Sequence, residues 1–380
     1  MSAKLSMPPM LATASAQESK QAEKVIKQAS LSPPNVMAYT KRKPNFRLSQ
    51  VSFKELPGWS TDKHEEAFLA FTRSCKRIIA AQMRRASAKN VKSKQVYDAC
   101  RIAAKFNSAP DRATAKKFFE KFFVPHKVNT SKKYGLLTGY YEPEILGSYQ
   151  KTERFSQPVY RKPRNMSWPL PTREEIDKGA LNGKGFELLY LEDAIDLFFL
   201  HIQGSGRIRL TDGSVIRIGF HSKNGHPYSS IGKYMIKKGY VPKAGMSLDA
   251  VKVYLRKNKH IQNEILWVNK SYIFFRKLKK RLVKMSGPLG AMQVPLTPGR
   301  SLAVDTRYHE LGMPIYVVSA SMNHHGANGF RRLMVAQDVG SAILGSERGD
   351  IFWGTGDKAG TIAGNTGNHG NYFVLLPKQS

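Results

Sequence analysis

The chain has 380 residues, of which 41% are hydrophobic and 10% aromatic, so it is long enough for more than one domain and too apolar to be disordered throughout. Its 61 Lys and Arg residues against 28 Asp and Glu residues give a formal charge of +33, which is typical of proteins that contact an acidic polymer or surface. The two cysteines exclude a disulfide-rich scaffold and a four-cysteine zinc site, and no run of about 18 apolar residues is present to cross a membrane as a helix.

The positive charge is concentrated before residue 285. Residues 285–380 carry seven Lys or Arg, six Asp or Glu and 15 of the 30 glycines, so their net charge is only +1. Basic runs such as Lys41–Lys43 and Lys277–Lys284 fit either solvated faces or attraction to an acidic polymer. Specific nucleic-acid binding is disfavoured because no zinc finger, RNA-recognition motif or basic zipper accompanies the charge.

Residues 1–57 are predicted to be a disordered basic tail or a processed segment, because they are rich in Lys, Ser, Ala, Gln and Pro. Residues 10–17 end in an A-x-A pattern, with Ala14 and Ala16, which resembles the end of a weak secretory signal. No cysteine follows it to accept a lipid.

Three helices are expected next, at about 62–79, 94–106 and 111–124. Asp62 with Glu65 indicates a capping box for the first, and apolar residues recur at helical spacing in all three. Cys75 and Cys100 fall on the apolar faces of the first two helices. They are expected to be either buried thiols or a disulfide between the helices, and a disulfide requires an oxidising compartment.

From residue 127 onward the pattern changes to short strands. Strands are predicted at 135–141 and 271–275, and the short apolar run 195–202 is also predicted to be a strand. Residues 207–219 alternate on both sides of Asp212-Gly213, which indicates a hairpin. Two short helices are expected at 229–239 and 247–257. Five further short strands, separated by Gly or Pro turns, suggest a small barrel. They are expected at 301–304, 314–319, 332–337, 351–353 and 372–376.

Carboxylate chemistry remains after the common motifs are excluded. The sequence has no HExxH, no CxxC and no G-x-S-x-G serine, and the glycines of residues 204–206 lack a Walker lysine. Asp338 ends an apolar strand, and Asp350 precedes Ile, Phe and Trp. Burial beside these apolar residues would raise the pKa of Asp350 and keep it able to donate a proton; the alternative is a strand-entry Asp bonded to turn amides. Trp353 and Phe352 could stack on a sugar or pack in the core.

Several motifs occur together in one order: TGYYEP at 138–143, HIQGSG at 201–206, LAVD at 302–305, AQDVG at 336–340 and GDIFWGTG at 349–356. Over residues 60–378 the set closely resembles the membrane-bound lytic murein transglycosylase A family, peptidoglycan lytic exotransglycosylases that carry a 3D domain named for three aspartates.

The resemblance implies a mainly β fold with N-terminal helices, in the α+β class. It implies a double-psi β-barrel (3D) domain with helices, formed by residues 58–141 and 287–380. A smaller β-rich domain at 142–286 would be inserted in it, and the glycan strand would lie in the groove between the two.

The resemblance also implies a lyase that cleaves the β-1,4 bond between N-acetylmuramic acid and N-acetylglucosamine and leaves 1,6-anhydromuramyl ends. The catalytic acid, acting next as base, falls on Asp350, with Asp338 and Asp305 in supporting roles. Substrate-binding positions fall on Thr138, Gly139, Tyr140, Tyr141, Gln203, Gly204, Ser205, Gly206, Trp353, Gly354 and Gly356. No cofactor and no metal are expected.

The expected partner is the peptidoglycan glycan strand, and an anionic outer-membrane surface is a second partner that suits the charge. No specific nucleic acid is expected, and a monomer is. The expected location is the periplasm, with outer-membrane association left open because no lipobox cysteine is seen. Three alternatives remain for function: a hydrolase of the same fold that uses Asp338 and Asp350 as a pair, a non-catalytic glycan-binding module, and a nucleic-acid binder driven by its charge.

Overall fold

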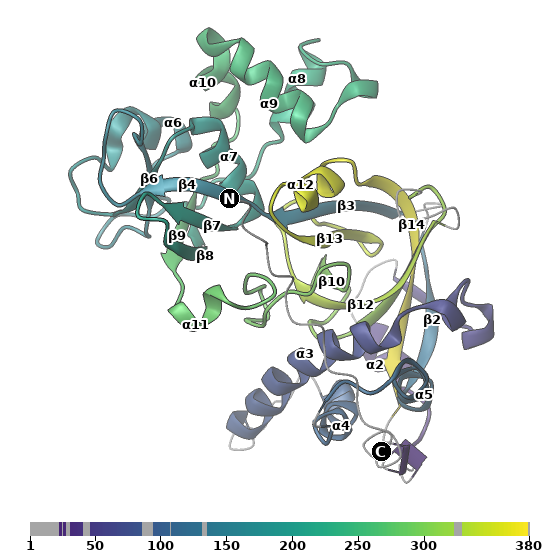
Figure 1. The fold of residues 1–380 in the computed structure, drawn as a ribbon. Helices are drawn as coiled ribbons and strands as arrows, with labels where there is room; N and C mark the ends of the chain where they lie inside the picture. Colours follow the sequence, from purple (N-terminus) through teal and green to yellow (C-terminus); the bar gives the residue numbers. More distant parts are fainter. Residues whose placement is uncertain are drawn as a thin grey trace, which may run out of the picture. The chain divides into compact units, whose positions relative to one another are not determined.

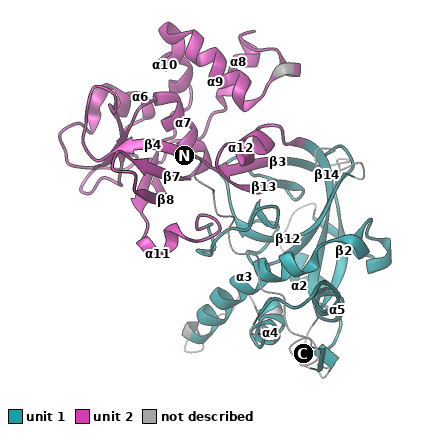
Figure 2. Cartoon of the chain, viewed as in Figure 1, with its two compact units in different colours: residues 1–137, 290–350, 368–380 teal, residues 138–289, 351–367 magenta. Residues whose placement is uncertain are grey.

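The structure, a computed structural model, describes residues 23–24, 26–27, 31–40, 46–85, 94–106, 108–130, 135–322 and 329–378. The signal-like segment 10–17 lies outside these residues. The chain forms two compact units (Figure 2). Unit 1 contains residues 1–137, 290–350 and 368–380, and unit 2 contains residues 138–289 and 351–367.

Unit 1 combines helices with most of an eight-stranded sheet (Figure 1). Its elements are α2 (Val36–Thr40), β1 (Arg47–Gln50), the 3-10 turns η1 (Phe53–Glu55) and η2 (Trp59–Thr61), α3 (His64–Arg85), α4 (Lys94–Ala103), α5 (Arg112–Phe122), β2 (Phe123–Asn129), β10 (Ser301–Val304), β11 (Pro314–Ser319) and β12 (Phe330–Asp338). The chain passes between the units within or beside three further strands, β3 (Gly135–Glu142), β13 (Arg348–Thr355) and β14 (Gly367–Pro377).

The strand order of this sheet is β1-β2-β14-β11-β12-β10-β13-β3, and β14 also pairs with β3. Six of the strands therefore close into a ring. β10 and β12 run parallel, with Ser301 opposite Val335, whereas β11 is antiparallel to both β12 and β14. All five strands predicted after residue 300 are present, and β12, β13 and β14 are longer than the segments expected from the sequence.

The three predicted helices are confirmed as α3, α4 and α5. Asp111 caps α5, because its carboxylate accepts from the backbone N–H of Thr114 at 2.9 Å. Asp62, expected to cap α3, is instead buried and forms a salt bridge with Arg300 at 2.9 Å. The sequence pattern at Asp62 thus predicted the start of the helix correctly, but it did not predict that the Asp62 carboxylate pairs with Arg300.

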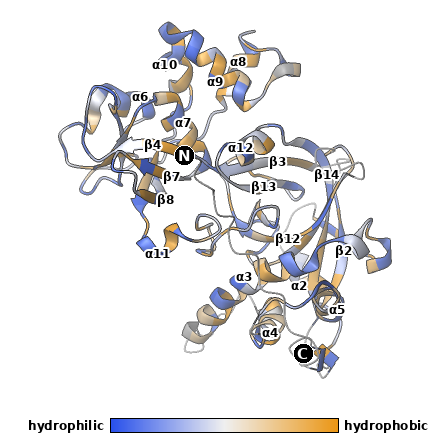
Figure 3. Ribbon diagram, in the orientation of Figure 1, coloured by the Kyte–Doolittle hydropathy of each residue, from blue (hydrophilic) through white to orange (hydrophobic). Residues whose placement is uncertain are grey.

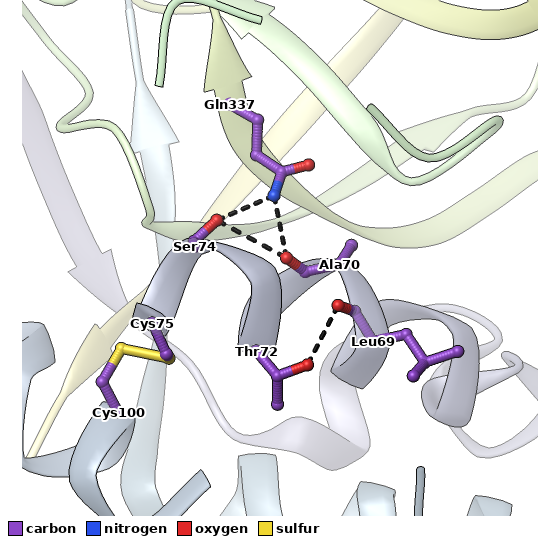
Figure 4. The surroundings of a disulfide bond; sticks show 7 residues. All are labelled: Leu69, Ala70, Thr72, Ser74, Cys75, Cys100 and Gln337. Atoms are coloured by element: carbon purple, nitrogen blue, oxygen red, sulfur yellow. Dashed lines mark hydrogen bonds between the residues drawn. A yellow bond between two sulfur atoms is a disulfide. The ribbon is translucent and has the colours of Figure 1, made fainter. Parts of the chain in front are cut away.

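Cys75 of α3 and Cys100 of α4 are joined by a disulfide, with their Cα atoms 4.8 Å apart (Figure 4). On the same helix, Gln337 of β12 donates to the carbonyl of Ala70 at 2.8 Å and to the hydroxyl of Ser74 at 2.7 Å. These contacts attach α3 both to its neighbouring helix and to the sheet, directly before Asp338.

Residues 46–57 differ from the expectation of a tail without a fold. Arg47–Gln50 form β1, which pairs antiparallel with β2, and Phe46 and Leu56 are buried. The tail composition hid this strand because its partner lies 80 residues further along the chain, and local composition carries no signal for such a pairing.

Unit 2 contains a six-stranded sheet with the order β5-β6-β4-β7-β8-β9. Its strands are β4 (Glu144–Ser148), β5 (Gln157–Tyr160), β6 (Glu187–Leu191), β7 (Ser205–Leu210), β8 (Val215–Lys223) and β9 (Ile273–Lys277). Its helices and turns are α6 (Arg173–Glu175), η3 (Ile176–Ala180), α7 (Ala194–Gln203), α8 (Ile231–Lys237), η4 (Lys243–Gly245), α9 (Leu248–Lys257), α10 (Lys259–Trp267), α11 (Lys280–Val283) and α12 (Asp357–Gly364). The predicted hairpin is confirmed as β7 and β8, and the two predicted short helices are α8 and α9.

The apolar run 195–202 is helix α7, so its prediction as a strand was wrong. Asp193 caps the helix by accepting from the N–H of Ile195 at 2.6 Å, and Gly204 ends it in the left-handed conformation with φ 75°. A short apolar run has no periodicity that separates a buried helix from a buried strand, so the two flanking caps were the informative signals.

Hydrophobic and hydrophilic residues alternate along the helices (Figure 3). In unit 2 the apolar residues of α7, α8, α9 and α10 form one buried cluster, and those of the sheet form a second against the other face of α7. Within the described part of the chain, no helix combines the length and apolar character needed to cross a bilayer.

Candidate functional site

The three aspartates singled out by the sequence lie on, or directly after, three neighbouring strands. Asp338 ends β12 and pairs in register with Ala303 of β10, and Asp305 follows β10 directly. β13, which carries Asp350, is the next strand after β10 in the sheet. Residues that are far apart in the sequence are therefore assembled by the strand order of unit 1.

Asp305 has its carboxylate occupied by several donors. It is 4% exposed and accepts from the backbone N–H of Arg307 at 3.0 Å, from the Arg307 guanidinium and from the N–H of Gly345 at 2.7 Å. Burial acts to raise the pKa of Asp305, but the hydrogen bonds from Arg307 and Gly345 outweigh it and hold the pKa below its ordinary value. The side chain is thus a fixed anion that orders a turn.

Asp338 is half-buried and also orders backbone. Its Oδ1 accepts from the N–H of Ala291 at 2.8 Å and from the N–H of Val339 at 2.9 Å. These bonds connect the end of β12 to the segment with which the chain re-enters unit 1.

Asp350 is half-buried near the start of β13, between Gly349 and Ile351, which are both buried. Its charge acts on Tyr372 of β14, a phenol with no exposed surface. Burial raises the pKa of Tyr372, Arg348 opposes the rise, and Glu347 and Asp350 add to it. Asp350 is therefore close enough to the buried Tyr372 for its charge to act on that phenol.

In unit 2 the TGYYEP segment is held by a buried ion pair. Glu142, which ends β3, has no exposed surface, and its Oε1 lies 2.8 Å from Nε of Arg217 of β8. A second guanidinium nitrogen donates to Oε2 at 3.0 Å, and the hydroxyl of Thr355 donates to the same oxygen at 2.8 Å. Burial raises the pKa of Glu142, with Arg217 and Thr355 opposing the rise.

Arg217 is the main structural residue that the sequence analysis missed. Besides Glu142 it donates to the carbonyl oxygens of Leu282 at 2.6 Å and Gly287 at 2.9 Å. The N–H of Gly356 donates to the carbonyl of Glu142 at 2.9 Å. Glu142 thus connects two of the motif segments, TGYYEP and GDIFWGTG. Its partner Arg217 lies in the alternating stretch 207–219, and that was the signal available in the sequence.

The HIQGSG segment contacts TGYYEP through one side chain. Gln203, the last residue of α7, accepts from the backbone N–H of Tyr141 at 3.0 Å. Gly204 is the C-cap described above, and Ser205 and Gly206 begin β7, both buried, paired with Gly219 and Ile218 of β8. The glycines of this segment thus have structural explanations.

His201 of the same segment is a core residue. It is 4% exposed and lies edge-on to the ring of Tyr272, with the ring centroids 4.3 Å apart, and neither ring nitrogen has a hydrogen-bond partner among the described residues. Burial, followed by the nearby Arg173, lowers its pKa well below the ordinary value. His201 is therefore neutral in the folded chain.

The aromatic residues around Asp350 on β13 are packed. Phe352 is fully buried, with its ring 5.4 Å from that of Tyr140, and Trp353 is 8% exposed and donates from Nε1 to Thr366 at 3.0 Å. A Cβ at Gly139 would lie 2.5 Å from Nε1 of Trp353, so only glycine fits that approach. These contacts favour core packing over sugar stacking for both rings.

The other expected substrate-binding positions fall near the same segments. Thr138 is half-buried on β3, Tyr140 and Tyr141 are 9% and 7% exposed, and Gly354 and Gly356 lie at and beyond the end of β13. Among the described residues no three His, Cys, Asp or Glu side chains are grouped to hold a metal ion.

Comparison with known proteins shows two matching family models. One, described as the MltA specific insert domain, matches residues 136–276, and the other, described as the 3D domain, matches residues 300–376. Membrane-bound lytic murein transglycosylase A of Escherichia coli (strain K12) is 37% identical over 243 residues, 63% of this chain and 64% of that protein. The alignments with the curated relatives thus span slightly less than two thirds of their length.

Solved structures match over more of the chain. The crystal structure of a membrane-bound lytic murein transglycosylase from Agrobacterium tumefaciens is 32% identical with a TM-score of 0.77, covering 87% of this chain and 97% of that one. The crystal structure of E. coli MltA with bound chitohexaose is 29% identical with a TM-score of 0.66, covering 88% and 95%.

Proposed function

Because this chain belongs to the membrane-bound lytic murein transglycosylase A family, we propose that it cleaves the β-1,4 bond between N-acetylmuramic acid and N-acetylglucosamine in peptidoglycan and leaves 1,6-anhydromuramyl ends. The observation that carries the proposal is that Asp338, Asp305 and Asp350 lie on, or directly after, three adjoining strands of one sheet. Asp305 and Asp338 accept hydrogen bonds from backbone N–H groups, and Asp350 lies half-buried on β13 between buried residues.

In the proposed reaction Asp350 is first the general acid. Its carboxyl proton passes to the glycosidic oxygen as the bond from that oxygen to the anomeric carbon of the muramyl residue breaks. The muramyl 6-hydroxyl then bonds to the same carbon, and its proton returns to the Asp350 carboxylate. No water enters, and the nucleophile belongs to the substrate, so one carboxyl suffices where an ordinary glycosidase needs two.

The supporting residues act through the backbone in this proposal. Asp305 and Asp338 fix the turns beside β10 and β12, and Glu142 with Arg217 holds the end of β3 against the end of β13 within unit 2. Oriented dipoles must stabilise the oxocarbenium character at the anomeric carbon. Residues 138–141, 203–206, 354 and 356 remain the proposed contacts to the glycan, whereas the packing of Trp353 favours a role in the core.

We further infer that the ring of strands is the double-psi β-barrel of the family. The parallel pairing of β10 with β12 inside an otherwise antiparallel part of the ring supports this, as does the match of the 3D domain to residues 300–376. The insert model at residues 136–276 supports an inserted domain at 142–286.

A periplasmic location, with peptidoglycan as the partner, belongs to the same proposal. The Cys75–Cys100 disulfide supports an oxidising compartment. The formal charge of +33 suits a polymer whose peptides carry carboxylates, and also an anionic outer-membrane surface; binding to either should weaken as salt screens it.

Digestion of purified peptidoglycan by Asp350→Asn and Asp338→Asn, followed by mass spectrometry of the products, tests the mechanism. Removing a general acid costs about 10²–10⁴ in rate, so Asp350→Asn should lose nearly all activity. Asp338→Asn keeps the Oδ1 acceptor and should retain most of it. The product of the wild type should be lighter by one water than the hydrolysed product. A heavier product together with inactivity of both variants would favour the paired-aspartate hydrolase, and no digestion by the wild type would favour a binding module.

A further inference from the structure

Unit 2 contains a cleft of about 860 Å³ whose lining is charged. Five carboxylate residues and three cationic residues line it, above a floor that includes Ile145 and Phe199. The carboxylates are Glu144, Glu192, Asp193, Asp196 and Asp357, and the cations are Lys252, Arg256 and Lys259. In a chain with only 28 acidic residues, this gathering of carboxylates is a specific feature of the cleft.

One side of the cleft is fixed by ion pairs. Asp196 of α7 lies 2.8 Å from Lys252 and 3.2 Å from Arg256, both of α9. Arg256 also contacts Asp193, the N-cap of α7, at 3.0 Å. This network holds α9 against α7 and leaves the wall rigid.

Two charged groups of the lining remain without an ion pair among the described residues. Lys259 is the first residue of α10 and is exposed, and Asp357 is the first residue of α12 and is exposed. A cation at the start of a helix is unfavourable, because the N-terminus carries partial positive charge. The negative charge of Asp357 is favourable at the N-terminus of α12. The positive charge of Lys259 at the N-terminus of α10 does not stabilise that helix.

The negative groups of the cleft act on Tyr141. This residue belongs to the TGYYEP segment and also lines the cleft. Burial raises its pKa to about 12, and the charges of Asp196, Asp357 and Asp249 add to the rise. The cleft is therefore continuous with one of the segments proposed to contact the glycan.

We propose that this cleft binds the peptide side chain of peptidoglycan, with Lys259 pairing a peptide carboxylate and Asp357 pairing a peptide amine. The proposal rests on the function proposed above. A neutral sugar is held by hydroxyl contacts and exposed aromatic faces, but here the aromatic residues Tyr141 and Phe199 are 7% and 9% exposed. A polyanion would be repelled by the carboxylates, whereas a short peptide with both signs of charge complements the two unpaired groups.

The test compares two substrates, peptide-bearing glycan strands and the same strands after enzymatic removal of the peptides. Lys259→Met should lower kcat/KM for the peptide-bearing strands by about twofold to fivefold, the effect of losing one exposed charge pair, and Lys259→Arg should restore it. Activity on the bare strands should not change. Lys257→Met, a neighbouring exposed lysine outside the cleft lining, is the matched control and should leave both activities as in the wild type.

Binding of the free peptide released from the same material, measured by calorimetry, gives a readout independent of cleavage. The Kd should rise by a similar factor in Lys259→Met and not in Lys257→Met. Equal activity losses on both substrates, or no loss on either, would overturn the peptide cleft while leaving the transglycosylase proposal intact. Failure of the wild type to digest either substrate would instead overturn the proposed function.

Discussion

Replacing Glu142 by Gln should be far more damaging than the same change two residues later, at Glu144. Glu142 and Arg217 are 0% and 1% exposed at their side chains, and Gln preserves shape while removing the charge that pairs the guanidinium. Leaving one member of a buried pair uncompensated costs about 3–5 kcal/mol. Because whole domains are stable by only about 5–15 kcal/mol, the loss should be large enough to lower the urea midpoint of unit 2 strongly.

Glu144→Gln is the matched control, because that carboxylate pairs with Arg207 and Arg209 at a partly exposed position and its loss should cost below about 1 kcal/mol. Urea unfolding followed by tryptophan fluorescence suits the measurement, since three of the four tryptophans, at 168, 267 and 353, belong to unit 2. If the free energies of unfolding of the two variants differ by less than about 1 kcal/mol, the Glu142–Arg217 ion pair does not stabilise unit 2 as predicted. Combining Glu142→Leu with Arg217→Met should cost less than the sum of the single changes.

Three further changes follow from the packing. His201 stays neutral in the folded chain but binds a proton in the unfolded chain, so the free energy of unfolding should fall as the pH drops below about 6.5. In unfolding titrations at pH 5–7.5, His201→Phe should reduce that fall by up to about 1.4 kcal/mol per pH unit. An unchanged slope would contradict a neutral, buried His201. Gly139→Ala should cost about 1–3 kcal/mol and shift the emission of Trp353, which its Cβ would press against, in fluorescence-detected unfolding. Cys75→Ser, which opens the bond to Cys100, should lower the free energy of unfolding by about 2–4 kcal/mol. The difference should shrink under reducing conditions to the cost of a buried hydroxyl in place of the Cys75 thiol.

Local signals in the sequence were sufficient for much of the fold. Asp212-Gly213 between alternating residues predicted β7 and β8, and Asp111 after Pro110 predicted the start of α5, because hairpin turns and helix caps are formed by adjacent residues. Helix α7 was missed for the complementary reason. Its caps, Asp193 and Gly204, are local, but the apolar run between them has no period that excludes a strand.

Contacts between distant residues were beyond the reach of a single sequence. The pairing of Glu142 with Arg217 joins residues 75 apart, and β1 pairs with a strand about 80 residues later. The spacing along the sequence does not predict either the ion pair or the strand pairing. The motif around Glu142 showed that the segment matters, but the partner of its carboxylate depends on how β3 and β8 meet in the folded unit.

The choice among the three aspartates shows why a motif needs geometry beside it. Each lies at a strand end or start in an apolar context, so burial by itself would make all three candidates for the proton donor. Hydrogen-bond donors bear on Asp305 and Asp338, because N–H groups and a guanidinium aimed at a carboxylate favour its ionised form and oppose proton donation. Asp305 receives both kinds of donor, and the Oδ1 of Asp338 receives two backbone N–H groups. The hydrogen bonds to Asp305 and Asp338 therefore support the turn-ordering roles proposed for these two residues, and the Asp350→Asn variant is the test of the acid role proposed for Asp350.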